Sequence, residues 1–154
     1  MSQENVERAA LKAVGLDGYA MSEDNALVVQ RMYEAANRRD FALARELLHP
    51  QAELHQLGLG VAPDAGTSYG REQWERDFAR WLSEWEEPRF DPQEVTEADD
   101  CVIMRVRVSG RGKTSGIETA MDLFHGWTFR DGKPHRCFVR STREEILKAL
   151  GPEA

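Results

Sequence analysis

Three segments in the C-terminal half alternate between apolar and polar residues, and they constrain the fold more than any other feature. In CVIMRVRVS, the alternate residues that share one face of an extended strand are Val102, Met104, Val106 and Val108. The run GRGKTSG that follows is typical of a hairpin turn, and Asp131-Gly132 is typical of a tight turn. We therefore expect consecutive antiparallel strands over residues 101–109, 116–130 and 134–141, with residues 89–97 as a further candidate strand.

The first half of the chain has helical periodicity instead. Between residues 25 and 38 the apolar side chains gather on one side of a helix, and Asp40 suits the N-cap of a second, short helix. The segment REQWERDFARWLSEW carries aromatic residues at spacings of four, three and four, within an arc of roughly 60°. These are Trp74, Phe78, Trp81 and Trp85. We expect helices at about 24–38, 41–48 and 70–86, the last ended by Pro88, and a loop over residues 58–70.

Helices followed by a run of antiparallel strands are typical of an α+β domain rather than of a parallel sheet. The apolar face of such a sheet must be covered, and the helices carry the apolar stripes to cover it. We expect one domain over residues 21–154, preceded by an N-terminal extension over residues 1–20. A short strand is expected in AELHQLGLG, where Ala52, Leu54 and Gln56 alternate with Glu53, His55 and Leu57.

The net charge of −7 argues against a nucleic-acid partner, because a phosphate-binding surface needs concentrated positive charge. Cys101 and Cys137 fit no metal-binding spacing and no disulfide framework, as expected for reduced cytoplasmic thiols. No apolar run approaches the roughly 20 residues of a membrane span, and the polar start is unlike a signal peptide. GRGKT lacks the first glycine of a P-loop. We therefore expect a cytoplasmic protein without a cofactor, a metal site or a membrane partner.

The long strand places His125 among large apolar residues. Its face reads Met121, Leu123, His125, Trp127 and Phe129. A single histidine on an apolar face is more often a core residue with a satisfied hydrogen bond than a catalyst. Pockets, however, are also where histidines with shifted pKa values carry out chemistry. His55, at a strand end, can also be explained as a partly exposed polar residue. Tyr33, at the rim of the apolar stripe of the first helix, can also be explained as an ordinary amphipathic tyrosine.

The order of elements and several local motifs resemble SnoaL-like proteins of the nuclear transport factor 2-like superfamily. NALVVQRMYEAANRRDFALARELLHPQAELH resembles their two-helix opening and first strand, and GREQWERDF resembles the start of their third helix. GWTFRDGKPHRCFVRSTREEIL resembles their closing hairpin and last helix. The resemblance covers about residues 22–151. It implies a cone-shaped, curved antiparallel sheet packed against three helices around an apolar pocket, often dimerised through the outer sheet face.

Among these relatives, ketosteroid isomerases offer a residue-by-residue comparison. The position of their carboxylate base, at the end of the first strand, falls on His55, and that of their second carboxyl group falls on His125. Their helix tyrosine falls on Met32, next to Tyr33. The absence of both carboxylates argues against ketosteroid isomerase activity itself. The resemblance implies instead that a pair of histidines occupies the positions that carry chemistry in relatives.

Two main hypotheses follow for function. In the first, the chain is a cofactor-free isomerase, cyclase or dehydratase acting on a small, mostly apolar carbonyl compound, with His55, His125 and Tyr33 as acid–base and oxyanion-binding groups. The expected pocket wall consists of Trp74, Phe78, Trp81, Met121, Leu123 and Trp127. In the second, the same pocket binds a ligand without turnover; an accessory dimeric subunit is a third interpretation. We expect a homodimer, with Ile103 and Phe124 on the outer sheet face.

Overall fold

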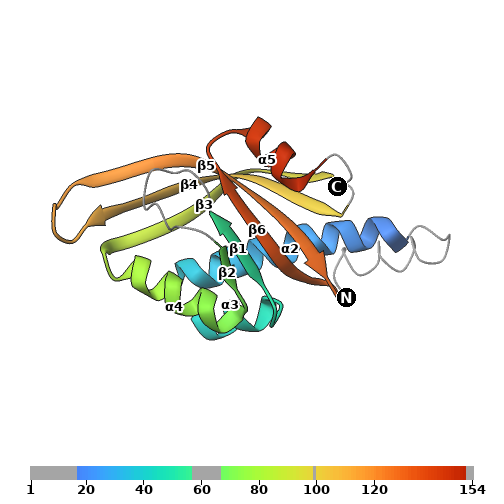
Figure 1. The fold of residues 1–154 in the computed structure, drawn as a ribbon, viewed down its shortest axis with the longest axis horizontal. Helices are drawn as coiled ribbons and strands as arrows, with labels where there is room; N and C mark the ends of the chain where they lie inside the picture. Colours follow the sequence, from blue (N-terminus) through green and yellow to red (C-terminus); the bar gives the residue numbers. More distant parts are fainter. Residues whose placement is uncertain (1–16, 57–66, 99, 152–154) are drawn as a thin grey trace.

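The computed structural model describes residues 17–56, 67–98 and 100–151 and has the expected α+β architecture (Figure 1). The helices are α2 (Asp17–Asn37), α3 (Phe41–Leu47), α4 (Arg71–Leu82) and α5 (Arg143–Leu150). The strands are β1 (Glu53–Gln56), β2 (Thr67–Tyr69), β3 (Trp85–Ala98), β4 (Cys101–Gly112), β5 (Glu118–Arg130) and β6 (Lys133–Arg140). The three strands expected in the C-terminal half are therefore confirmed, as is a two-residue turn at Asp131-Gly132, where both residues have positive φ.

The strands form one curved six-stranded sheet in the order β2-β1-β6-β5-β4-β3. All neighbours pair antiparallel except β1 and β6, which run parallel, so the sheet is mixed rather than fully antiparallel as expected. The register places Leu54 beside Cys137, Cys137 beside Trp127, and Trp127 beside Val102. These four buried residues mark the concave face of the sheet, on which the core lies.

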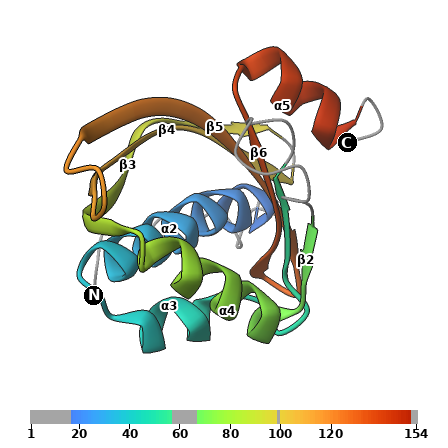
Figure 2. The same ribbon diagram turned by 60° about the vertical axis from the view of Figure 1, so that its left-hand side comes forward.

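Helix α2 crosses the concave face, with α3 and α4 beside it (Figure 2). The apolar stripe expected on this helix is confirmed, because Val29 and Ala35 are completely buried. At its C-terminal end the Asn37 amide donates to the carbonyl of Phe90 and accepts from the Phe90 N–H, at 2.8 and 2.9 Å. Asp40 caps α3 as expected, because its carboxylate accepts from the N–H of Leu43. These contacts fix the helices beneath the sheet.

Helix α4 ends four residues earlier than its aromatic periodicity predicts. It stops at Leu82, and Trp85 begins β3, where it pairs with Gly112. Pro88 therefore does not end the helix but lies buried within β3, at the irregularity where Glu87 has a φ of 50°. Because pairing with β4 satisfies the backbone polar groups of this segment, it overrides the aromatic spacing, which would also suit a helix.

The loop expected over residues 58–70 contains the short strand β2. Its Ser68 pairs with Leu54 of β1, and Tyr69 pairs with Glu53. Three residues are too few to show a period-2 pattern, so the sequence could not indicate this strand. Most of the remaining residues of that predicted loop lie outside the described part of the chain.

Helix α5 lies on the convex face, opposite the other helices (Figure 2). The expected capping box at its start is confirmed, because Thr142 accepts from the N–H of Glu145. Ile146 is completely buried against Gly126, where a Cβ would meet Ile146 at 3.3 Å. Ile103 pairs with Gly126 and is only 3% exposed. Ile103 thus points away from the concave face, as expected, but the chain buries it within its own fold, so it is not available for a dimer contact.

The N-terminal part of the chain is described from Asp17 onward, where α2 begins within the expected extension of residues 1–20. Residues 1–16 lie outside the described part of the chain. The domain boundary at residue 21 stays a prediction. Among the described helices, none is long and apolar enough to cross a membrane.

Candidate functional site

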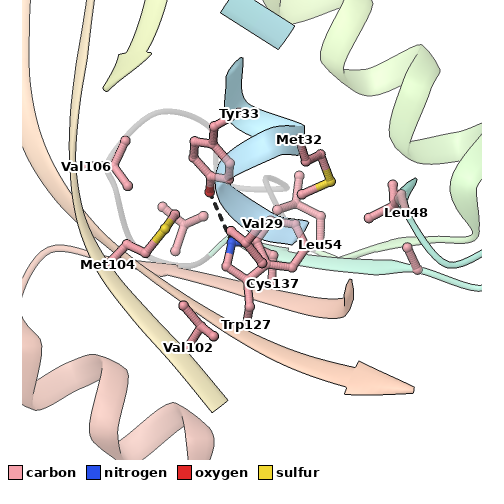
Figure 3. Packing of buried hydrophobic residues seen from close by; sticks show 12 residues of the cluster. Val29, Met32, Tyr33, Leu48, Leu54, Val102, Met104, Val106, Trp127 and Cys137 are labelled. Atoms are coloured by element: carbon pink, nitrogen blue, oxygen red, sulfur yellow. Dashed lines mark hydrogen bonds between the residues drawn. The ribbon is translucent and has the colours of Figure 1, made fainter. Parts of the chain in front are cut away.

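A buried chain of hydrogen bonds joins α2 to β5 on the concave face. The indole N–H of Trp127 donates to the Tyr33 hydroxyl at 3.1 Å (Figure 3). The same hydroxyl lies 2.5 Å from Nδ1 of His125. Tyr33 and His125 are each 7% exposed, and Trp127 is 2% exposed. Alternation in β5 brings His125 and Trp127 to the same face, and the apolar stripe of α2 brings Tyr33 against them.

The hydrogen-bond donors of Trp127 and Tyr33 determine which tautomer of His125 is satisfied. An indole N–H can only donate, so the Tyr33 oxygen accepts from Trp127. Among the described residues the Tyr33 hydroxyl has no third polar contact, so its own hydrogen is satisfied only by donating to Nδ1 of His125. Nδ1 is then an acceptor and the proton of the neutral ring is on Nε2. Nε2 makes no hydrogen bond within the described part of the chain, which leaves one N–H donor available.

Burial keeps both ionisable residues of this hydrogen-bonded group, His125 and Tyr33, neutral. Desolvation lowers the pKa of His125 to about 4, because the buried ring resists a positive charge. Desolvation likewise raises the pKa of Tyr33 well above its usual range, an effect that the hydrogen bond from Trp127 only partly opposes. At neutral pH this group therefore acts through neutral hydrogen-bond donors. Tyr33 is committed to orienting the imidazole of His125 and does not itself supply a free hydroxyl.

Aromatic rings from α4 lie on the helix side of the sheet, and Trp74 among them contacts this group. Trp74 stacks on Trp127 at 5.6 Å between ring centroids, and Phe78 stacks on Trp81 at 6.3 Å. Phe90 of β3 packs against Phe78 and Trp81. No residue of α4, all of which the structure describes, is fully buried. The rings thus retain exposed apolar surface although they lie on the side of the helix that faces the sheet.

The two other expected wall residues lie further along β5. Leu123 is partly buried and packs against the core. Met121 is 49% exposed, towards the tip of the long hairpin of β4 and β5 that extends beyond the helices (Figure 1). Its exposure places it away from the buried group around His125.

His55 lies on the other face of the sheet. It pairs with Phe138, which pairs with Gly126, the glycine that α5 covers from the convex side. Its ring stacks on Phe138 at 4.7 Å, and its two nitrogens contact Glu53 at 2.9 Å and Thr67 at 3.1 Å. These neighbours account for its polar groups without any ligand.

The expectation that His55 and His125 face one cavity is therefore wrong. Strand alternation had already grouped His55 with Glu53, opposite Leu54 and Gln56, whereas the comparison with ketosteroid isomerases pointed the other way. In the structure Gln56 pairs with Val139, which pairs with His125. Gln56 is thus the residue of β1 that shares the concave face with His125. A one-residue error in position along a strand moves a side chain to the opposite face.

Two further polar groups were not singled out from the sequence. The hydroxyl of buried Ser68 donates to Asp77 of α4 at 2.5 Å. His49 and His135 are both 8% exposed with their rings 5.1 Å apart, and desolvation lowers the pKa of His135. Asp77 gave no signal because a carboxylate next to an aromatic stripe usually belongs to a solvated helix face.

Among the described residues, no group of three or more histidine, cysteine or carboxylate side chains could hold a metal ion. A surface hollow of about 370 Å³ opens at the start of α4. Its lining is Arg45, Pro50, Tyr69, Gly70, Arg71, Glu72, Gln73 and Arg76, which includes none of the expected site residues.

The fold and this site can be compared with known proteins. Bal32a from a soil-derived mobile gene cassette is 25% identical, with a TM-score of 0.71 over 78% of this chain and 90% of that protein. TerC, crystallised with polyporic acid, is 23% identical, with a TM-score of 0.68 over 80% and 95% of the two chains. IdmH of Streptomyces antibioticus, a proposed polyketide cyclase, is 23% identical, with a TM-score of 0.65 over 82% and 98%.

At 23% identity the likeness to TerC and IdmH concerns the fold. No curated protein matches the chain in sequence. The family model of the SnoaL-like domain matches residues 29–135, a span that runs from the buried stripe of α2 through β1 to β5 and into the start of β6. The chain therefore belongs to the SnoaL-like domain family, within the nuclear transport factor 2-like superfamily.

Proposed function

We propose that the chain binds a small, mostly apolar carbonyl compound against the concave face, with the Nε2–H of His125 donating to the carbonyl oxygen. The observation that carries this proposal is the 2.5 Å contact between Tyr33 and Nδ1 of His125, which leaves the Nε2–H as a donor with no hydrogen bond within the described part of the chain. The partly exposed rings of Trp74, Phe78 and Trp81 supply apolar surface for the rest of the ligand. Sparse polar groups among aromatic rings are typical of small-molecule sites.

Membership of the SnoaL-like family supports a small-molecule or cyclase-type function but does not select the ligand. In this proposal His125 is a donor rather than a base, because Nδ1 is occupied and the ring is neutral. Tyr33 is a positioning residue, and His55 has no part in the site. This differs from a paired-histidine mechanism in assigning all contact with the carbonyl group to one imidazole.

Binding can be tested with 1-tetralone, a bicyclic aromatic ketone, and with tetralin, the same ring system without the carbonyl. Quenching of tryptophan fluorescence gives both dissociation constants. We expect the ketone to bind more tightly than the hydrocarbon by roughly threefold to tenfold, the range of one neutral hydrogen bond. His125→Phe should remove this difference while leaving the affinity for tetralin similar, because one ring replaces another on an apolar face.

His55→Phe is the matched control, because it makes the same change on the convex face. It should leave both dissociation constants unchanged. Equal affinities of the native protein for ketone and hydrocarbon, or an equal effect of the two phenylalanine variants, would contradict the proposal. Polyporic acid, the compound present with TerC, is a useful second probe because its quinone carbonyls offer the same acceptor group.

The second candidate function is catalysis through an enolate, in which the proton of the carbon next to the carbonyl passes to solvent water while the same donor stabilises the oxygen. A neutral N–H held in place by a buried partner is suited to stabilising a developing oxyanion. Nuclear magnetic resonance would follow deuterium exchange at the carbon next to the carbonyl of 1-tetralone. Enzymatic exchange that falls by about 10²-fold or more in His125→Phe would support an isomerase- or cyclase-like activity. Ketone binding without exchange would support a binding protein instead.

A further inference from the structure

Asp77 is a carboxylate that a part-buried hydrogen bond from Ser68 links to the concave layer. It lies on α4, roughly 60° from Trp74 and 40° from Trp81 around the helix axis, so it flanks the aromatic stripe. Its partner Ser68 is 6% exposed and pairs directly with Leu54, a core residue of the concave face. The 2.5 Å bond between Ser68 and Asp77 therefore points the carboxylate towards the sheet.

The carboxylate retains hydrogen-bonding capacity after this contact. Ser68 occupies Oδ2, whereas the nearest cation to Oδ1 is Arg80 at 3.9 Å, which is too long for a direct hydrogen bond. The Arg80 side chain is 77% exposed and the Asp77 side chain 34% exposed. A carboxylate in this position can accept at least one more hydrogen bond from a group lying along the aromatic rings.

The same rings connect Asp77 to the His125 group. Trp74 is one helical turn before Asp77 and stacks on Trp127. Trp127 in turn donates to the tyrosine that holds His125. The aromatic surface between these points thus has a hydrogen-bond donor at one end, on β5, and an acceptor at the other, on α4.

We propose that Asp77, positioned by Ser68, accepts a hydrogen bond from a hydroxyl group of the ligand, so that the ligand class is a hydroxylated aromatic ketone. This inference rests on the proposed function, because His125 is taken to hold the carbonyl end. It adds a second polar contact and an orientation of the ligand, with the carbonyl towards β5 and the hydroxyl towards α4. A ligand with both groups on a flat ring system matches the chemistry of both ends.

The structural alternative is that Ser68 and Asp77 only tie β2 to α4. The two roles make different predictions for ligand discrimination. Loss of a purely structural contact would lower stability and change the affinities for all ligands alike. Loss of a hydrogen-bond acceptor would instead change the difference in affinity between a hydroxyl and a methoxy group at the same ring position. A methoxy group keeps the ring oxygen but replaces its hydrogen by a methyl group, so it cannot donate; the dependence of the difference on Asp77 separates this loss from the added bulk.

The test uses 1-tetralone, its 5-, 6- and 7-hydroxy derivatives and the three corresponding methoxy derivatives, with the full chain and fluorescence titration. At least one hydroxy isomer should bind about fivefold or more tightly than its methoxy counterpart. Asp77→Asn should reduce that ratio by about twofold or more, because a charge-assisted hydrogen bond is about twice as strong as a neutral one and the asparagine oxygen can still accept. The affinity for unsubstituted 1-tetralone should not change.

Ser68→Ala serves as the second variant and should reduce the same ratio by a smaller factor, because it loosens the carboxylate without removing it. Thermal unfolding of both variants provides the fold control. A hydroxy-to-methoxy ratio near one for all three isomers, or a ratio that Asp77→Asn leaves intact, overturns the proposal. If 1-tetralone binds no better than tetralin while the Asp77-dependent ratio persists, the His125 proposal fails and the Asp77 acceptor stands.

Discussion

His55 and His125 lie on opposite faces of one sheet, and they have opposite surroundings. His125 is enclosed by the core, forms a hydrogen bond with Tyr33, and is kept neutral by burial, which lowers its pKa to about 4. His55 retains 21% side-chain exposure and has both nitrogens engaged, by Glu53 and Thr67. The residue type is the same, but of these two imidazoles only that of His125 has a nitrogen without a hydrogen bond to the described part of the chain.

The two faces differ in the same way as a whole. The concave face is apolar with a few buried polar groups, so each of its hydrogen bonds is costly to lose. The convex face carries exposed ion pairs across β3, β4 and β5, such as Arg105 with Glu94 and Arg107 with Asp122. Exposed pairs contribute little individually. The comparison teaches that strand alternation separates polar groups suited to a site from polar groups that keep a surface solvated.

The largest expected effect is that of Trp127→Ala. This change removes a ring that is 2% exposed, stacks on Trp74 and donates to Tyr33. We expect the free energy of unfolding to fall by about 3–5 kcal/mol, as for other large-to-alanine changes in a core. Denaturation with urea measures it. Phe138→Ala on the convex face should cost clearly less, and equal losses would contradict the difference between the faces.

The pH dependence of stability should be the next largest effect. Above about pH 6.5 His125 is neutral in both folded and unfolded chains and contributes nothing. Between pH 6.5 and about 4 the unfolded histidine takes up a proton that the folded one resists, so stability falls as pH drops. The loss reaches about 3 kcal/mol. Denaturation curves from pH 7 to pH 4 would show it.

His125→Phe should flatten this decrease, because it removes the titrating group. A part should remain, because burial, aided by neighbouring His49, also lowers the pKa of His135. His55→Gln should leave the decrease almost intact. A profile that depends on His55 as strongly as on His125 would be inconsistent with the assignment of the two faces.

On the convex face, Gly126→Ala should destabilise by about 1–3 kcal/mol, the usual cost of overpacking. The new Cβ would lie 3.3 Å from Ile146 and 3.4 Å from Leu150. Combining it with Ile146→Ala tests the cause, because the two losses should then be less than additive. Strict additivity would show that α5 moves freely over this glycine and does not cover it tightly.

The smallest effect should be that of Arg107→Ala, on the exposed ladder of ion pairs. Its side chain is 53% exposed and contacts Asp122 at 3.3 Å. We expect less than about 1 kcal/mol, and less still at high salt. A loss comparable to that of Gly126→Ala would indicate that this surface is buried in solution, as in the homodimer expected from the sequence, which stays a prediction.

Local rules in the sequence predicted much of this molecule. Alternation identified β4, β5 and β6 and grouped His125 with Trp127, and helical periodicity identified the buried stripe of α2. The caps at Asp40 and Thr142 followed from side chains that satisfy backbone N–H groups within three residues. Each of these features depends on neighbours in the chain, so the amino-acid order alone determined them.

Contacts between distant segments decided the rest. Pairing with β4 converted the end of the expected aromatic helix into β3 at Trp85, and pairing with β1 made β2 from three residues without a pattern. Tyr33 precedes His125 by 92 residues, so no local pattern in the sequence indicates their 2.5 Å contact. The link between Ser68 and Asp77 likewise exists only because α4 folds back over β2. A period in the sequence tells which face a side chain takes on its own element, but what that face meets depends on packing over the whole chain.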